Sequence, residues 1–134
     1  MDILLFDADN DGDNDCYIVS GGNEFEIDSP YLLDRFYLND GKGNLVKSSN
    51  SIPSNLSSGM RVSANDFDKD GDLDLFVGGR VVPGSYPLPA NSYILINESN
   101  SGQVKFTNAD ASIFPFSDIG LVSSSVWTDY NNDS

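Results

Sequence analysis

The chain has 134 residues, of which 21 are Asp or Glu and 7 are Lys or Arg, so its formal net charge is −14. This charge argues against nucleic acid as a ligand, because phosphates need Lys and Arg to neutralise them. The 11% aromatic content and the many Val, Ile and Leu residues exclude a disordered acidic tail. No run of about 18 apolar residues occurs, so we expect no membrane insertion.

The first residues are typical of a strand. They lack a basic region and a small-residue cleavage site, so we expect no signal peptide in this chain. The predicted strand, Asp2–Phe6, runs directly into an acidic loop, Asp7–Asp15. The single cysteine, Cys16, follows that loop, allows no internal disulfide and is expected to be a small buried residue.

The acidic nine-residue loop is repeated along the chain. It recurs as Asp66–Asp74, 59 positions after the first copy, and begins again at Asp129, a further 63 positions on. A near-constant period of this size predicts stacked supersecondary units. We place these units at residues 1–58, 59–119 and 120–134, the last being the truncated start of a third.

Each complete unit is predicted to form four strands joined by turns rich in Asn, Asp and Gly. The second strand of each unit is continuously apolar, which is typical of strands covered on both faces. Four-stranded units stacked face to face are β-propeller blades. The predicted fold class is therefore all-β, with β-propeller blades of four antiparallel strands, about two blades plus the first strand of a third. The predicted strands are Asp2–Phe6, Cys16–Ser20, Arg35–Asn39 and Asn44–Lys47 in the first unit, Gly59–Asn65, Leu75–Gly79, Ser92–Asn97 and Gln103–Thr107 in the second, and Gly120–Thr128 in the third.

A closed propeller needs at least about four blades, so we expect the chain to form part of a ring. The remaining blades would come from the same polypeptide in a longer protein, or from other copies of the chain associating through a heterologous interface. The long connectors between the second and third strands, Gly21–Pro30 and Arg80–Ala90, either recognise a partner or pack as spacers against the next blade.

The acidic loops have the composition of calcium sites. Five carboxylates within nine residues raise one another's pKa and favour unfolding unless a cation is bound. Calcium takes six to eight oxygens, which closely spaced Asp side chains on a tight turn can supply. We predict one Ca²⁺ in each complete loop, two in all. The predicted ligands are Asp7, Asp9, Asp11, Asp13 and Asp15 in the first loop and Asp66, Asp68, Asp70, Asp72 and Asp74 in the second.

The positions within the loop have different expected roles. Positions 1, 3 and 5 should offer side-chain oxygens, and the glycine at position 6 permits a sharp bend. Position 7, Asp13 or Asp72, should offer its backbone carbonyl and leave its side chain free. Position 9, Asp15 or Asp74, should close the coordination shell. The third copy, with Asp129, Asn131 and Asp133, has Ser134 in place of the glycine, and we assign it no metal.

Other cation sites fit the loops less well. An EF-hand has Glu at position 12, where this chain has the apolar residues Ile18 and Val77. Magnesium prefers few carboxylates and retains waters, and zinc is disfavoured by the absence of His. Acidic turns that bind nothing are the remaining alternative, and two copies with the same apolar continuation argue against it.

The loops and the residues around them resemble the FG-GAP repeat, also called the VCBS repeat, of the integrin α-subunit propeller and of many bacterial secreted proteins. The resemblance rests on Phe6–Gly22 and Asn65–Gly79. Within it, Val19–Phe25, Tyr37–Asn44 and Gly79–Gly84 are similar to bacterial propellers that accompany ASPIC/UnbV-type domains. The resemblance implies a seven- or eight-bladed calcium-binding propeller, secreted or on the cell surface, that serves adhesion or ligand binding. It departs at the truncated ends and at Ser134.

We expect a non-catalytic protein in which calcium is structural and the partner is an unidentified protein or glycan. The alternative is the propeller portion of an enzyme that acts on polysaccharide with a carboxylate pair. No such pair stands apart from the loops, and the absence of His removes the usual general base. The carboxylates outside the loops are expected to be solvated surface groups, such as Glu24, Glu26, Asp34 and Asp118.

Overall fold

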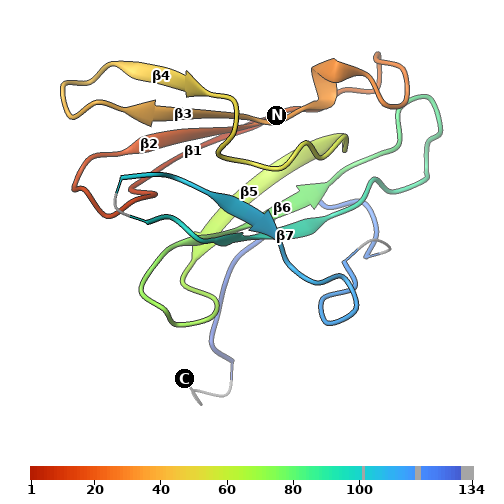
Figure 1. The fold of residues 1–134 in the computed structure, drawn as a ribbon. Helices are drawn as coiled ribbons and strands as arrows, with labels where there is room; N and C mark the ends of the chain where they lie inside the picture. Colours follow the sequence, from red (N-terminus) through yellow and green to blue (C-terminus); the bar gives the residue numbers. More distant parts are fainter. Residues whose placement is uncertain (101, 117–118, 131–134) are drawn as a thin grey trace.

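The computed structural model describes residues 1–100, 102–116 and 119–130, which form two antiparallel four-stranded sheets (Figure 1). In each sheet the strands pair in chain order. The first sheet contains β1 (Asp2–Phe6), β2 (Asp15–Val19), β3 (Arg35–Asn39) and β4 (Leu45–Ser48), and the second contains β5 (Gly59–Asn65), β6 (Asp74–Gly79), β7 (Tyr93–Asn97) and β8 (Phe106–Asn108). A 3₁₀ turn, η1 (Pro30–Leu32), precedes β3. The predicted all-β class is confirmed, with two stacked blade-like sheets and no closed ring among the described residues.

None of the described residues belongs to a helix with the length and hydropathy that a membrane crossing requires.

The strand bounds follow the prediction closely, and β1, β3 and β5 match it at both ends. The last strand is the largest difference within the two sheets, because β8 begins at Phe106 and not at Gln103. Gln103 instead forms an isolated bridge with Asn100, which closes the turn after β7. Val104 then turns into the core, where it is buried.

The core lies between the two sheets and is built from one face of each. Phe6 and Phe36 of the first sheet pack against Phe106 of the second, with ring centroids 6.1 to 6.4 Å apart. Aromatic rings in such edge and tilted arrangements stabilise a core beyond their buried area. Around them pack the other residues of this buried cluster, which are Ala8, Tyr17, Val19, Val62, Leu75, Val77, Leu95 and Val104.

A non-strand segment covers the other face of the second sheet, opposite the core. Trp127 contacts Phe76, and a side chain added at Gly78 would collide with Val122. The predicted third-unit strand, Gly120–Thr128, is wrong for this structure, because no residue of that stretch is in a strand. Val122 donates to the Gly79 carbonyl at 3.0 Å, but the paired ladder that defines a strand is missing.

The first sheet exposes the face whose equivalent in the second sheet is buried. Aligning Asp7 with Asp66 makes Ile3 equivalent to Val62. Ile3 is 62% exposed and its neighbour Leu5 is 59% exposed, whereas Val62 is buried against the first sheet. The molecule therefore presents an apolar sheet face of the kind that blades bury against each other.

Candidate functional site

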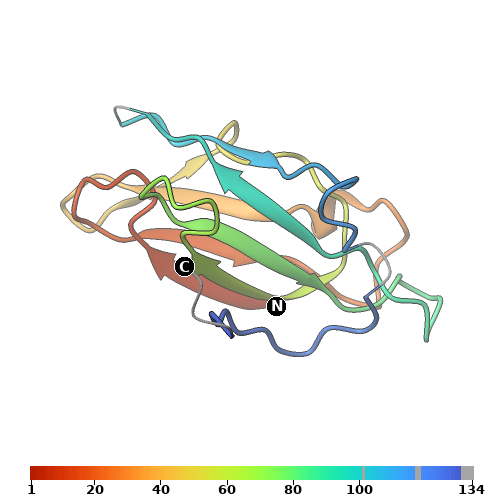
Figure 2. The same cartoon turned by 90° about the horizontal axis from the view of Figure 1, so that it is seen from below.

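The two acidic loops lie beside each other at one end of the stacked sheets (Figure 2). One links β1 to β2 and the other links β5 to β6, so parallel stacking of the sheets brings both hairpin turns to the same end. Asn10 Nδ2 of the first loop donates to Asp72 Oδ1 of the second at 2.6 Å. The expectation of a free side chain at position 7 is thus wrong for Asp72, whose carboxylate joins the two loops.

The two loops have the same backbone conformation. Position 4 has a positive φ in both, 58° at Asn10 and 64° at Lys69. Position 6 is also left-handed, with φ of 96° at Gly12 and 101° at Gly71, a region that favours glycine. The repeat in sequence is therefore a repeat in local structure, and the predicted role of glycine at position 6 is confirmed.

The aspartate at position 1 holds each loop closed. Asp7 Oδ2 accepts a hydrogen bond from the Gly12 N–H at 2.9 Å, and Asp66 Oδ2 accepts the matching bond from Gly71 at 3.1 Å. Each bond spans five residues, so the carboxylate lies inside the curl of the loop. Side chains at positions 3 and 5 can then turn toward it.

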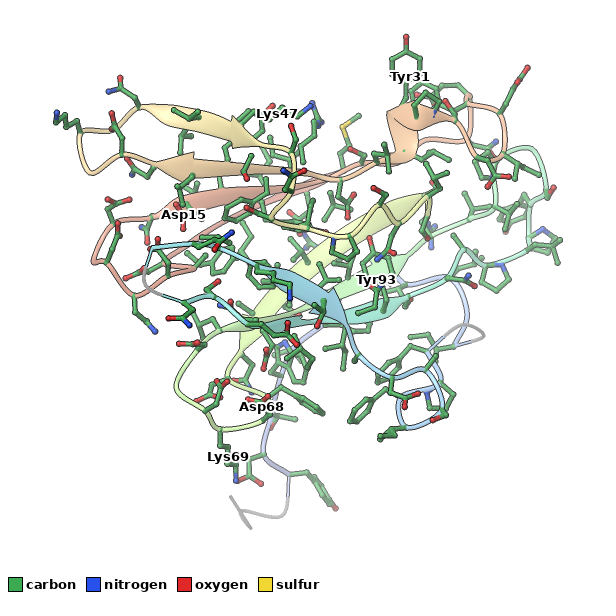
Figure 3. The ribbon with its side chains drawn as sticks, in the orientation of Figure 1. Asp15, Tyr31, Lys47, Asp68, Lys69 and Tyr93 are labelled. Carbon is green, nitrogen blue, oxygen red and sulfur yellow. The ribbon has the colours of Figure 1, made fainter. Side chains whose placement is uncertain are left out.

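Three carboxylates converge in each loop, with one oxygen of each within 4.8 Å of the others. In the first loop they belong to Asp7, Asp9 and Asp11, which are positions 1, 3 and 5. In the second they belong to positions 1, 3 and 9. Figure 3 shows Asp68 in the lower loop, with Lys69 beside it extending away. The second group consists of Asp66, Asp68 and Asp74, and the predicted ligands outside both groups are Asp13, Asp15, Asp70 and Asp72.

Both loops contain enclosed carboxylate oxygens that lack a hydrogen-bond partner in the described structure. These atoms are Oδ1 of Asp9, Asp13 and Asp66. Burying a polar atom without a partner is costly, and buried polar groups are normally satisfied. Burial raises the pKa of Asp9, and the charges of Asp11 and Asp7 raise it further. A bound cation would satisfy these oxygens and offset the repulsion, so the residues fit a hard divalent ion.

Position 9 has a second role that joins the loop to the sheet. Asp15 and Asp74 are both only 1% exposed. Asp15 accepts hydrogen bonds from the N–H groups of Ala8 at 3.2 Å and Asn39 at 2.8 Å. Asp74 accepts the equivalent bonds from Phe67 at 2.9 Å and Asn97 at 2.8 Å. Burial raises the pKa of both carboxyls, and these N–H donors oppose the rise.

An asparagine at the end of the third strand completes this arrangement in each unit. Asn39 Nδ2 donates to the Asn14 carbonyl at 3.0 Å, while Asn97 Nδ2 donates to the carbonyls of Leu73 at 3.3 Å and Ala8 at 2.9 Å. Asn97 therefore links the loops of both units. Our sequence reasoning missed both asparagines, although their matching place at the end of the third strand was a usable signal.

Asp34 corrects one expectation, because it is not a solvated surface group. Its Oδ2 accepts from the hydroxyls of Tyr17 at 2.6 Å and Tyr93 at 2.8 Å, and its Oδ1 accepts from Ser20 N–H at 2.7 Å. Figure 3 shows Tyr93 reaching from the second sheet toward the first. Burial raises the pKa of Asp34, and the three donors partly oppose this. Glu24 and Glu26 are exposed as expected, and Asp118 lies outside the described residues, as do Asn131, Asp133 and Ser134 of the third loop.

The two long connectors contact each other. Gly84 N–H of the second connector donates to Asn23 Oδ1 of the first at 3.0 Å.

Cys16 is buried, as expected, and is a free cysteine.

The fold and the acidic loops agree with the family match that comparison with known proteins found. No curated protein and no solved structure matches the chain. The model of the FG-GAP-like repeat matches residues 7–77, a span that begins at the first acidic loop and ends within β6, just after the second. This match covers more than half of the chain. The chain therefore belongs to the FG-GAP-like repeat family.

Proposed function

We propose that the chain is a calcium-binding segment of a β-propeller and that its calcium ions are structural. The observation that carries the proposal is the pair of carboxylate groups in two loops of the same backbone conformation, together with enclosed oxygens that have no hydrogen-bond partner among the described residues. When bound, calcium would supply positive charge at each loop and so offset the repulsion between the carboxylates. Because the unfolded chain lacks the curled loop, the ion stabilises the folded state by linkage.

The chain's own residues divide the work of holding the ion and fixing the hairpin. In the first loop Asp7, Asp9 and Asp11 would hold calcium, while Asp15 binds the backbone of the sheet. In the second loop Asp74 would do both, since its carboxylate is near those of Asp66 and Asp68 and also accepts two N–H groups. Oxygen-only donors at close spacing favour calcium over softer metals.

We further propose that the protein is non-catalytic, acts in adhesion or ligand binding, and works outside the cell or on its surface. Extracellular modules commonly bind calcium at about 0.1 to 1 mM, a concentration range suited to exposed loops of this kind. The buried carboxylates of the two sheets are held by backbone or tyrosine donors, which suits a structural role.

A titration with calcium that is monitored by calorimetry tests the proposal. We expect about two ions per chain, and about one for either Asp9→Asn or Asp68→Asn, because each removes a charged ligand from one loop. Glu26→Gln, which neutralises an exposed carboxylate outside the loops, is the matched control and should keep both sites. A wild-type chain that binds no calcium, or loop variants that bind as many ions as the wild type, would disprove the proposal.

A further inference from the structure

A cavity of about 510 Å³ opens beside the first sheet, next to η1. Its lining includes Leu33, Asp34 and Arg35 from the start of β3 and Lys47 and Ser48 from β4. Lys47 lies on the outermost strand of this sheet (Figure 3). Arg35 and Lys47 form no ion pair with any other described residue, although the chain carries 21 acidic residues.

The second unit has an equivalent cavity, and the structure shows which residues of the first unit make contacts there. Lys47 faces Tyr37 across β3 and β4, as Asn108 faces Leu95 across β7 and β8, so Asn108 is the counterpart of Lys47. Arg35 faces Ile18 as Tyr93 faces Val77, so Tyr93 is the counterpart of Arg35. The smaller cavity of the second unit, about 310 Å³, is lined by both counterparts.

Part of the first unit occupies this place in the second. The side-chain amides of Asn55 and Asn108 donate to each other at 2.8 and 3.1 Å. Ser57 Oγ donates to the Asn91 carbonyl at 2.7 Å. These contacts come from the connector that leads directly into β5, residues 51–58. The connector is therefore the natural occupant of such a place.

Tyr93 supplies the second contact between the units. Its hydroxyl donates to Asp34 of the first unit at 2.8 Å. The counterpart of Asp34 in the second unit is Ser92, whose Oγ accepts from Gly79 N–H as Asp34 accepts from Ser20 N–H. Each unit thus offers two groups to the neighbour before it, and in the second unit both are uncharged donors.

In the first unit both of these groups are cations. Arg35 replaces the tyrosine hydroxyl and Lys47 replaces the amide. A cation binds a carboxylate more strongly than it binds a neutral acceptor. We propose that the cavity beside η1 accepts the connector of a neighbouring repeat unit that carries a carboxylate where this chain has Asn55. The proposal deepens the proposed function by naming the chemistry of the partner.

A second copy of this chain matches this description only in part, since Asp118 of its second unit is the sequence counterpart of Asn55. The unit it would present is the second one, which has Ser92 where Asp34 stands in the first. The face of that unit away from the core is moreover covered by Val122 and Trp127. The partner is therefore a different repeat unit of acidic character.

An extended chain tests the proposal with a matched design. Met60 is the counterpart of Met1, so a copy of residues 51–59 placed directly before Met1 reproduces the connection between the two units. One version keeps Asn at the place of Asn55 and the other carries Asp there. Both are combined with wild-type Lys47 and with Lys47→Asn, which restores the residue of the second unit.

We expect the Asp extension to lower the unfolding equilibrium constant by about threefold to fivefold relative to the Asn extension, as measured by denaturant unfolding. The gain should vanish with Lys47→Asn and persist with Lys42→Gln, a lysine in the β3–β4 turn. Equal stability of the two extensions, or a gain that survives Lys47→Asn, overturns the proposal. Stabilisation of the unextended chain by acetate to the same extent would assign the cavity to small anions and overturn it too.

The unfolding of all four proteins, the two extensions each with Lys47 and with Lys47→Asn, is measured with calcium and with chelator. The proposed contact lies away from the acidic loops, so the difference between the extensions should be the same in both. A chain that binds no calcium but shows the difference would refute the proposed function alone, and the reverse result would refute this inference alone.

Discussion

Asp34 is the residue where burial and charge oppose each other most clearly. Burial raises its pKa above the ordinary value of 3.8, while Ser20 N–H, Tyr17 and Tyr93 favour the charged carboxylate. Burial also raises the pKa of both tyrosines well above 10.0. Both hydroxyls thus stay protonated as donors at neutral pH. One carboxylate joins side chains of both sheets by these donors.

The pH dependence of stability follows from the direction of this shift. A carboxyl whose pKa is higher in the folded state contributes most stability below its unfolded pKa, and the contribution is lost as pH rises through the folded pKa. We therefore expect the unfolding free energy of the wild type, relative to Asp34→Asn, to fall as pH rises from about 4 toward neutrality. Urea unfolding of both proteins in chelator over this range measures it. A relative stability that rises with pH would contradict the assignment.

At the scale of elements, each acidic loop is part of a hydrogen-bonded corner that joins three strands. The position-9 aspartate holds the loop and the end of the third strand, and the asparagine there holds the loop in return. The loop is thus fixed to its sheet by direct bonds. A bound ion would strengthen a corner that the protein already forms.

Asp15→Asn tests this corner without calcium. Asparagine offers one neutral acceptor oxygen, so one of the N–H groups of Ala8 and Asn39 loses its acceptor. A buried donor left unsatisfied costs about 1 to 3 kcal/mol, and we expect that loss in the unfolding free energy measured in chelator. The exposed control Glu26→Gln should change it by less than about 0.5 kcal/mol. Equal effects of the two variants would mean that Asp15 acts only through a metal.

The strands and loops could be predicted from sequence because their signals are local. Apolar runs mark β2 and β6, and acidic residues around Gly12 and Gly71 mark the turns. The corner could not be found in this way, because Asp15 and Asn39 are 24 positions apart and meet only after β3 pairs with β2. Asp34 was misassigned for the same reason, since its partners lie in both sheets.

At the scale of the whole molecule, the chain is two copies of one sheet in unequal surroundings. The second sheet is covered by the first on one face and by Phe116, Val122 and Trp127 on the other, whereas the first sheet leaves Ile3 and Leu5 exposed. The prediction of a strand at 120–128 was wrong for a reason that also belongs to this scale. A strand forms only beside a partner strand, and no described segment supplies one there.

The counterparts Val62 and Ile3 test this asymmetry directly. Val62→Ser removes a buried side chain and places a hydroxyl in the core, so we expect a loss of about 2 to 3 kcal/mol in unfolding free energy. Ile3→Ser changes an exposed position and should cost less than about 0.5 kcal/mol in the isolated chain. Denaturant unfolding measures both. A large, concentration-dependent cost for Ile3→Ser would show that copies of the chain cover this face in solution.

Calcium-dependent stability tests the central claim most directly. Thermal unfolding is followed by calorimetry in chelator and with calcium at about 100 times its dissociation constant. Each site then adds about 2.7 kcal/mol, so two sites should raise the midpoint by roughly 10 °C or more. The double variant Asp9→Asn with Asp68→Asn should melt at the same temperature in both solutions. A wild-type midpoint that calcium leaves unchanged would contradict the account.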